Sequence, residues 1–138
     1  ALIKYNEGKY PDALKLNKQV LALDPDYAEA HLLEGRVAFH KKNWKLAKAQ
    51  CLRAIECDPE LIISYVILAK TLHQLKETKL AIETLRTVLS LSPDDSDSHA
   101  LLGLLLLDQG DRKGAQEHLR EALRLNPNSE PAIEGFIE

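Results

Sequence analysis

The segment Gly103–Pro127 reads GLLLLDQGDRKGAQEHLREALRLNP and contains the signals of two helices. It begins with an apolar run, turns at Gly110 and Asp111, continues as an amphipathic stretch and stops at an Asn-Pro pair. Gly and Pro at such places end helices. The segment therefore predicts an apolar helix, a tight turn and a second, amphipathic helix.

The same pattern recurs every 34 residues along the chain. Four prolines and four alanines mark this period, and a small residue lies 12 residues upstream of each of the last three alanines. The prolines are Pro25, Pro59, Pro93 and Pro127; the alanines are Ala13, Ala47, Ala81 and Ala115; the small residues are Gly35, Ala69 and Gly103. A fixed period in this range indicates a repeat array.

These columns resemble the tetratricopeptide repeat, a helix-turn-helix unit of 34 residues with a small residue in its first helix, an Ala in its second and a closing Pro. The resemblance implies an all-α fold, a right-handed α-solenoid of stacked antiparallel helix pairs. It covers residues 1–138 as a partial repeat with a complete second helix at 1–27, repeats at 28–61, 62–95 and 96–129, and the start of a further helix at 130–138. Both ends predict that the parent protein continues.

Composition and charge narrow the classes of partner. The chain has 45% hydrophobic and 28% charged residues and a net charge of −3, with cations and anions interspersed. Proteins that bind nucleic acid usually carry a basic stripe or a high pI, so no nucleic-acid partner is expected. The longest apolar run, Ala100–Leu107, is far shorter than the ~18 residues that suggest a membrane span. Direct membrane insertion is therefore not expected either.

Cys51 and Cys57 lie on one expected helix and project from different faces, so they cannot bridge each other. We expect both to be small buried apolar residues. Two thiols without a disulfide framework favour a reducing compartment, which points to the cytoplasm.

Three residues carry local expectations. Asp26 can cap the helix that follows it, and Trp44 is expected to pack against the first helix of its repeat. Asn17 stands in a column that is otherwise apolar. This polar residue predicts that the first unit frays most easily.

No motif indicates catalysis, a metal site or a cofactor. The cluster Asp94-Asp95-Ser96-Asp97-Ser98-His99 fails as a calcium loop, because its sixth place is His99 instead of Gly and its twelfth is Leu105 instead of Glu. Helix capping and first-turn acidity account for this cluster. The histidines form no HExxH or comparable metal pair.

Individual histidines have other expected roles. His31 and His99 share the column of Tyr65, where the resemblance implies a packing ring. His40 and His73 lie near the ends of first helices and are expected to hydrogen-bond to solvent or a ligand, in preference to sharing a metal.

In the proteins that the chain resembles, first helices line a concave groove that binds a peptide or helix. Beside the packing stripe of each first helix runs a second stripe at spacings of three and four residues. The expected groove residues are Leu32, Arg36, Phe39, His40, Val66, Lys70, His73, Gln74, Ala100, Leu104, Leu107 and Asp108. The alternative is that several of them belong to the core.

A chaperone-docking groove is not expected. Members of the family with that function hold a carboxylate with Lys, Asn, Asn, Lys and Arg, and the comparable places here hold Leu32, Arg36, Ile67, Asp97 and Leu101.

The sequence thus predicts a non-catalytic scaffold for protein–protein interaction that binds a peptide or helix of a partner. Two alternatives stay open. The segment could be a substrate-recruiting arm of a larger multidomain enzyme, or an architectural module that self-associates end to end through its uncapped ends. The sequence does not name the partner.

Overall fold

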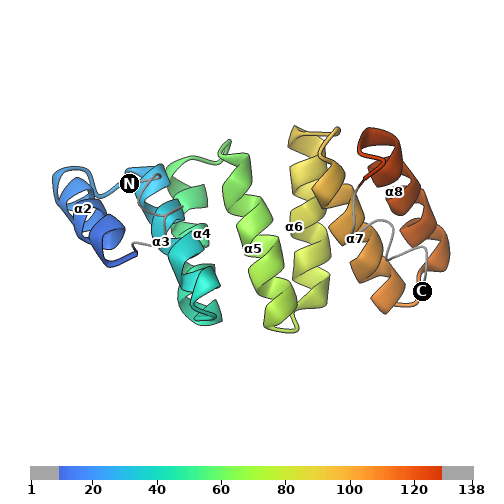
Figure 1. Cartoon of the computed structure of the whole chain (residues 1–138), viewed down its shortest axis with the longest axis horizontal. Coiled ribbons are helices and arrows are strands. Elements are labelled where there is room, and N and C mark those ends of the chain that lie inside the picture. Colours follow the sequence, from blue (N-terminus) through green and yellow to red (C-terminus); the bar gives the residue numbers. More distant parts are fainter. Residues whose placement is uncertain (1–9, 129–138) are drawn as a thin grey trace. The chain divides into compact units, whose positions relative to one another are not determined.

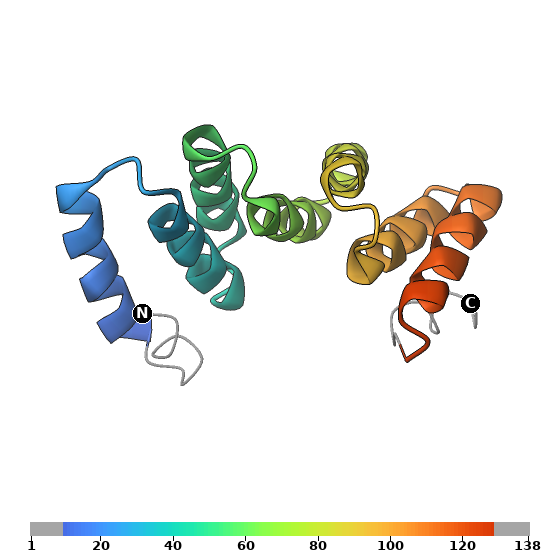
Figure 2. The ribbon, with the colours of Figure 1, turned by 90° about the horizontal axis from the view of Figure 1, so that it is seen from above.

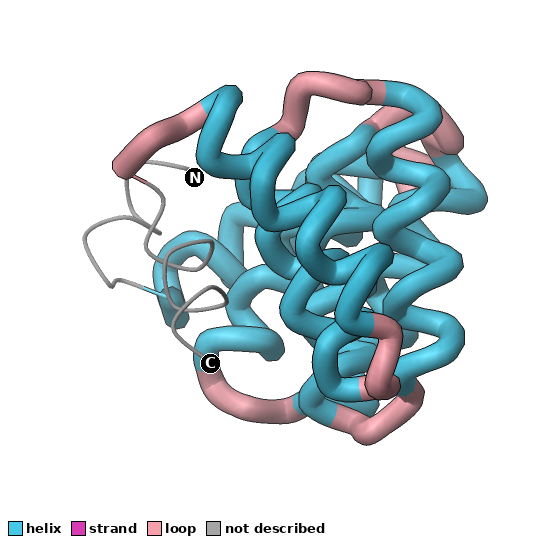
Figure 3. The backbone as a smooth tube through the Cα atoms, turned by 90° about the vertical axis from the view of Figure 1, so that its right-hand side faces the viewer, coloured by secondary structure: helices cyan, strands magenta, loops and turns pink. Residues whose placement is uncertain are grey.

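The computed structural model describes residues 10–128, and all regular structure in that range is α-helical (Figure 1, Figure 3). The helices are α2 (Tyr10–Leu23), α3 (Ala28–His40), α4 (Trp44–Cys57), α5 (Ile62–Gln74), α6 (Thr78–Leu91), α7 (Ser96–Asp108) and α8 (Arg112–Leu125). The all-α prediction is confirmed. The expectations for residues 1–9 and 130–138 lie outside the described residues.

Helix boundaries repeat with the period of the sequence. The first helices α3, α5 and α7 begin at residues 28, 62 and 96 and have 13 residues each. The second helices α2, α4, α6 and α8 begin at residues 10, 44, 78 and 112 and have 14 residues each. Equivalent residues therefore occupy equivalent places in successive helix pairs.

Each tight turn after a first helix uses one residue with left-handed backbone. That residue is Gly110 (φ 86°) after α7, but Lys42 (φ 62°) after α3 and Lys76 (φ 66°) after α5. The backbone N–H of Asn43 donates to the carbonyl of Ala38 at 2.8 Å, which closes the end of α3. Glycine adopts this conformation freely, so the two lysines hold a backbone geometry that costs them energy.

The turns at Pro25 and Pro59 are held by the Asp that precedes each of these prolines. Asp24 Oδ1 accepts the backbone N–H of Asp26 at 3.2 Å, and Asp58 Oδ1 accepts that of Glu60 at 3.0 Å. The expectation that Asp26 caps α3 is therefore wrong, because Tyr27 occupies the N-cap position and no side chain caps there. The acid that stabilises this turn is Asp24, whose carboxylate accepts a hydrogen bond from the backbone N–H two residues later.

The chain divides into two compact units, residues 1–75 and 76–138. In the first, α3 packs against α2, α4 and α5, and α4 also packs against α5. In the second, α7 packs against both α6 and α8. Figure 2 shows α3 beside α4 and α7 beside α8 as helical hairpins.

Small residues bring the helices of each pair together. The periodic Ala13, Ala47, Ala81 and Ala115 are all essentially buried. A Cβ added at Gly35 would lie 3.0 Å from Cys51 Sγ, and one at Gly103 would lie 2.7 Å from Leu119 Cγ. The small-residue column therefore sets the approach of α3 to α4 and of α7 to α8.

Asn17 does not interrupt the core as expected. Its side chain is 4% exposed, and its amide donates to the carbonyl of Ala30 at 2.7 Å. A buried polar group is costly mainly when it has no partner. Asn17 thus ties α2 to α3, and its polarity is no reason for the first unit to fray.

Candidate partner-binding surface

Helix α5 presents a mixed apolar and polar stripe. Val66 and His73 are half-buried, whereas Lys70 and Gln74 are exposed. Ile63 precedes them at the same helical spacing and is 49% exposed. Ile63 is absent from the expected groove residues, although its distance of three residues from Val66 and seven from Lys70 indicates the same helix face.

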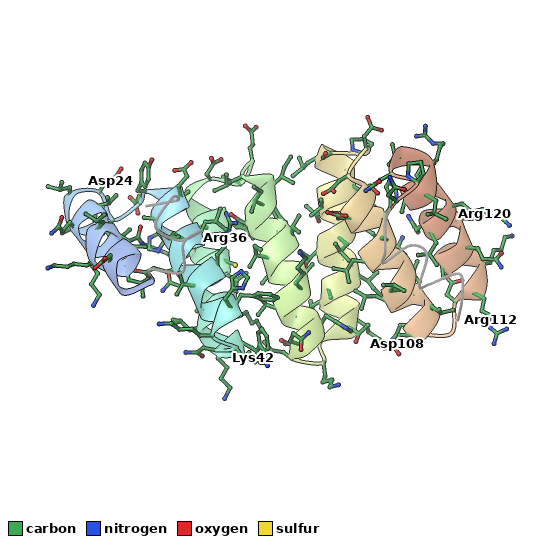
Figure 4. The ribbon with its side chains drawn as sticks, viewed as in Figure 1. Asp24, Arg36, Lys42, Asp108, Arg112 and Arg120 are labelled. Carbon is green, nitrogen blue, oxygen red and sulfur yellow. The ribbon has the colours of Figure 1, made fainter. Side chains whose placement is uncertain are left out.

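Helix α3 gives only part of its expected stripe to the surface. Leu32 is buried, Arg36 and Phe39 are half-buried, and His40 is exposed. Figure 4 labels Arg36 on this helix. The Phe39 ring meets the Trp44 ring edge to face, with centroids 5.1 Å apart. This contact confirms that Trp44 packs against the first helix of its repeat, and it gives Phe39 a structural role as well.

Helix α7 contributes Leu104, Leu107 and Asp108, the last labelled at the end of the helix in Figure 4. Leu104 and Leu107 are half-buried, and Asp108 is exposed. Ala100 is fully buried against Leu119 of α8. A fully buried methyl group cannot contact a ligand, so Ala100 belongs to the core and is not one of the groove residues.

A hollow between α2 and α3 adds an apolar feature to the first unit. Its volume is about 390 Å³, and the residues around it are mostly apolar. Leu32 and Arg36 line it together with Val20 and Tyr27, two partly exposed apolar side chains that the sequence analysis did not select. The structure therefore brings Leu32 and Arg36 to one place, at the side of α3 that faces α2.

The ring column has a more specific role than packing. Tyr65 Oη donates to the carbonyl of Pro59 at 2.8 Å. The Nε2 atoms of His31 and His99 lie 2.8 Å from the carbonyls of Pro25 and Pro93. Each ring therefore fixes the turn that precedes its repeat, by binding the carbonyl six residues before it.

The cluster Asp94–His99 forms local structure. Ser98 Oγ donates to Asp95 Oδ2 at 2.7 Å, and Ser96 Oγ donates to the carbonyl of Ala122 on α8 at 2.9 Å. Asp95 occupies the N-cap position of α7, but its side chain accepts no backbone N–H. Capping thus explains the cluster only in part, since the Asp95 carboxylate binds a hydroxyl.

The two cysteines differ in their surroundings. Cys51 is fully buried, and burial raises the pKa of its thiol to about 12. Cys57 is only half-buried, so the expectation of burial holds for Cys51 alone.

Within residues 10–128, no three or more metal-ligating side chains are grouped so that they could hold a metal ion, and no helix is long and apolar enough to cross a membrane.

Family models match residues 1–129 of the chain in consecutive blocks. Profiles described as tetratricopeptide repeat match residues 1–62, 62–95 and 96–129. Such repeats generally serve as non-catalytic modules for protein interaction. The chain is therefore a protein-interaction scaffold.

Relatives and solved structures agree with these profiles. Superkiller complex protein 3 of Mus musculus is 43% identical over 53 residues, which are 38% of this chain and 3% of that protein. The crystal structure of MamA has a TM-score of 0.86 at 23% identity and covers 96% of this chain and 77% of its own. The Arabidopsis OM64 TPR domain has a TM-score of 0.77 at 19% identity, and the match covers 80% of this chain and 91% of that domain. The chain thus spans a small fraction of its mouse relative and shares the helix-pair solenoid fold of these structures. It belongs to the tetratricopeptide repeat family.

Proposed function

We propose that the exposed stripes of the first helices bind a peptide or helix of a partner protein. The observation that carries this proposal is the stripe Ile63, Val66, Lys70 and Gln74 on α5. Ile63 keeps about half of its surface in water, and burying apolar surface contributes roughly 25 cal/mol per Å². A partner that covers Ile63 and Val66 would gain this stabilisation, with Lys70 and Gln74 available for polar contacts.

The stripes of the two units differ in charge, which suggests how a partner would be selected. On α5 the apolar residues are followed by Lys70, and on α7 Leu104 and Leu107 are followed by Asp108. Apolar contacts supply most of the affinity of such surfaces, whereas charges at the rim mainly affect specificity and association rate. We therefore expect acidic side chains in a segment that binds α5, and basic side chains in a segment that binds α7.

A matched pair of double variants tests the proposal. Ile63→Asp with Lys70→Glu alters the α5 stripe, and Leu46→Asp with Lys45→Glu alters α4 in the same unit. Leu46 is 43% exposed, close to Ile63 at 49%, and both lysines are exposed. The two variants therefore make the same chemical changes at similar exposure, and circular dichroism checks that both retain their helices.

Wild type and both variants are used as bait, and the captured proteins are identified by mass spectrometry and confirmed with purified partner. We expect binding to the α4 variant and a loss of at least about tenfold in affinity for the α5 variant, equivalent to about 1.4 kcal/mol. Equal binding by both variants would refute the role of α5. Light scattering over a concentration series tests the self-association alternative, because growth of the particle with concentration would favour an architectural module.

A further inference from the structure

Two histidine rings meet between α7 and α8. His99 Nδ1 lies 3.1 Å from His118 Nδ1, and the rings stack with centroids 5.3 Å apart. His99 Nε2 lies 2.8 Å from the carbonyl of Pro93, in the turn between α6 and α7. The pair thus links that turn, the first part of α7 and the middle of α8.

The hydrogen bonds restrict where the protons can be. A carbonyl oxygen only accepts, so His99 Nε2 carries a hydrogen. In neutral His99, Nδ1 is then an acceptor, and His118 Nδ1 must donate to it. One added proton is tolerated, because a cationic His99 can donate from Nδ1 to a neutral His118 whose hydrogen has moved to Nε2. When both rings are protonated, two N–H groups face each other and the bond is lost.

The first unit contains an equivalent contact that tolerates protonation. His31 Nε2 lies 2.8 Å from the carbonyl of Pro25, and His31 Nδ1 lies 3.0 Å from Gln50 Oε1. An amide offers either a donor or an acceptor after a half-turn of its end group. Gln50 can therefore keep its hydrogen bond to Nδ1 of His31 whether His31 is neutral or cationic. His118 cannot keep its hydrogen bond to Nδ1 of His99 once both rings are charged.

The surroundings oppose a second positive charge. The pKa of His118 is lowered first by burial, then by His99 and by Arg86 on α6, against smaller opposite effects of Glu117 and Asp111 on α8. The pKa of Glu121 is lowered mainly by its hydrogen bond with Arg124, with a smaller electrostatic effect of His99. Because the folded-state pKa of His118 is depressed, the unfolded chain binds more protons near and below the ordinary histidine pKa of about 6.5. The resulting loss of stability begins as the pH falls through that value and grows until the folded-state pKa is passed.

We propose that His99 and His118 form a proton-sensitive latch, which holds the start of α7 to α8 while at most one ring is protonated and releases it when both are. This inference does not depend on the proposed function, because it concerns the packing of the second unit alone. Its consequence is a start of α7 that opens more readily in mildly acidic surroundings than the equivalent start of α3.

Hydrogen exchange of the whole chain, with a chelator present and corrected for intrinsic rates, tests the latch. The variant His118→Gln supplies the amide that Gln50 supplies in the first unit. We expect exchange of the amides in residues 99–102, the first of which donates to the carbonyl of Asp95, to rise about tenfold between about pH 7.5 and about pH 5.5 in the wild type, equivalent to about 1.4 kcal/mol. In His118→Gln the rise should stay below about twofold. Equal rises in both proteins, or none in the wild type, would overturn the proposal.

Two further measurements keep the test independent of one variant. Nitrogen shifts of the imidazole rings in the neutral wild type should show the hydrogen of His99 on Nε2 and that of His118 on Nδ1, and any other pair of tautomers contradicts the bond pattern. Gln50→His should create acid-dependent exchange at the start of α3, and its absence counts against the mechanism. If stoichiometric Zn²⁺ without chelator stabilises the wild type but not His118→Gln, the pair is a metal ligand set and the latch is wrong.

Discussion

Replacing Gly103 by Ala tests how closely α7 and α8 approach each other. The new methyl carbon would lie 2.7 Å from Leu119 Cγ, 3.0 Å from Leu119 Cδ2 and 3.1 Å from the carbonyl oxygen of Ala115. Carbon atoms make their best contacts at about 3.5–4.0 Å. The methyl therefore forces the branch of Leu119 or the backbone of α8 to move.

The expected magnitude is the difference between two opposing effects. Overpacking a well-packed core costs about 1–3 kcal/mol, and Ala in place of Gly inside a helix stabilises by about 0.5–1 kcal/mol. We expect Gly103→Ala to lower the free energy of unfolding by about 1–2 kcal/mol. With Leu119→Ala, which alone costs about 2–5 kcal/mol, the obstacle is gone. On that background Gly103→Ala should stabilise by about 0.5–1 kcal/mol.

Urea unfolding followed by circular dichroism gives the four free energies of this double-mutant cycle. The coupling energy should be about 1.5–3 kcal/mol, with unchanged slopes against urea. Gly35→Ala is the control, because its nearest contact is the single Cys51 Sγ at 3.0 Å and its backbone contacts are at 3.5 Å. We expect it to cost less than Gly103→Ala. A Gly103→Ala effect of the same size and sign with and without Leu119 would refute this account of the helix approach.

Three other predictions concern single residues. Lys42→Gly should raise the free energy of unfolding in urea by about 0.5–1 kcal/mol, because the removed cost of left-handed backbone exceeds the extra entropy that glycine loses on folding. Gly110→Ala is the converse change and should lower the free energy of unfolding. Asp111 Oδ1 accepts the backbone N–H at the start of α8 at 2.9 Å, so Asp111→Ala should lower the melting temperature and cost about 1 kcal/mol. In thiol titration with an aromatic disulfide, Cys57 should react in the folded protein, whereas Cys51, whose pKa is raised to about 12 by burial, should react only after unfolding; fast labelling of both thiols would contradict the burial of Cys51.

The candidate surface could be predicted only in part. Spacing placed Lys70, Gln74 and Asp108 correctly on exposed faces, because residues three or four apart share one side of a helix. The same spacing could not separate Ala100 from Leu104, since both lie on α7 and only the position of α8 decides which of them is covered. Ile63 lies three residues before Val66, so spacing assigns it to the same face, but spacing does not show that an isoleucine at the start of a helix stays 49% exposed.

Polar residues within the helices show the same limit. Asn17 looks like a defect in an apolar column, and only the carbonyl of Ala30 beside it turns that polarity into a link between helices. The meeting of His99 with His118 joins residues that no sequence motif connects. Hydrogen-bond partners that lie on different helices depend on how the helices pack, which local spacing does not specify.

The sequence alone determined the repeat period, the helix pairs and their turns, because these depend on the local preferences of Gly, Pro, Ala and apolar residues that recur every 34 positions. The tertiary structure decided which side chains remain in contact with water and which polar groups find partners. That information comes from the approach of one helix to the next, set at Gly103 and Gly35 by the absence of a single methyl group. Local chemistry thus specifies the repeated helix pair, and contacts between packed helices specify which side chains remain exposed.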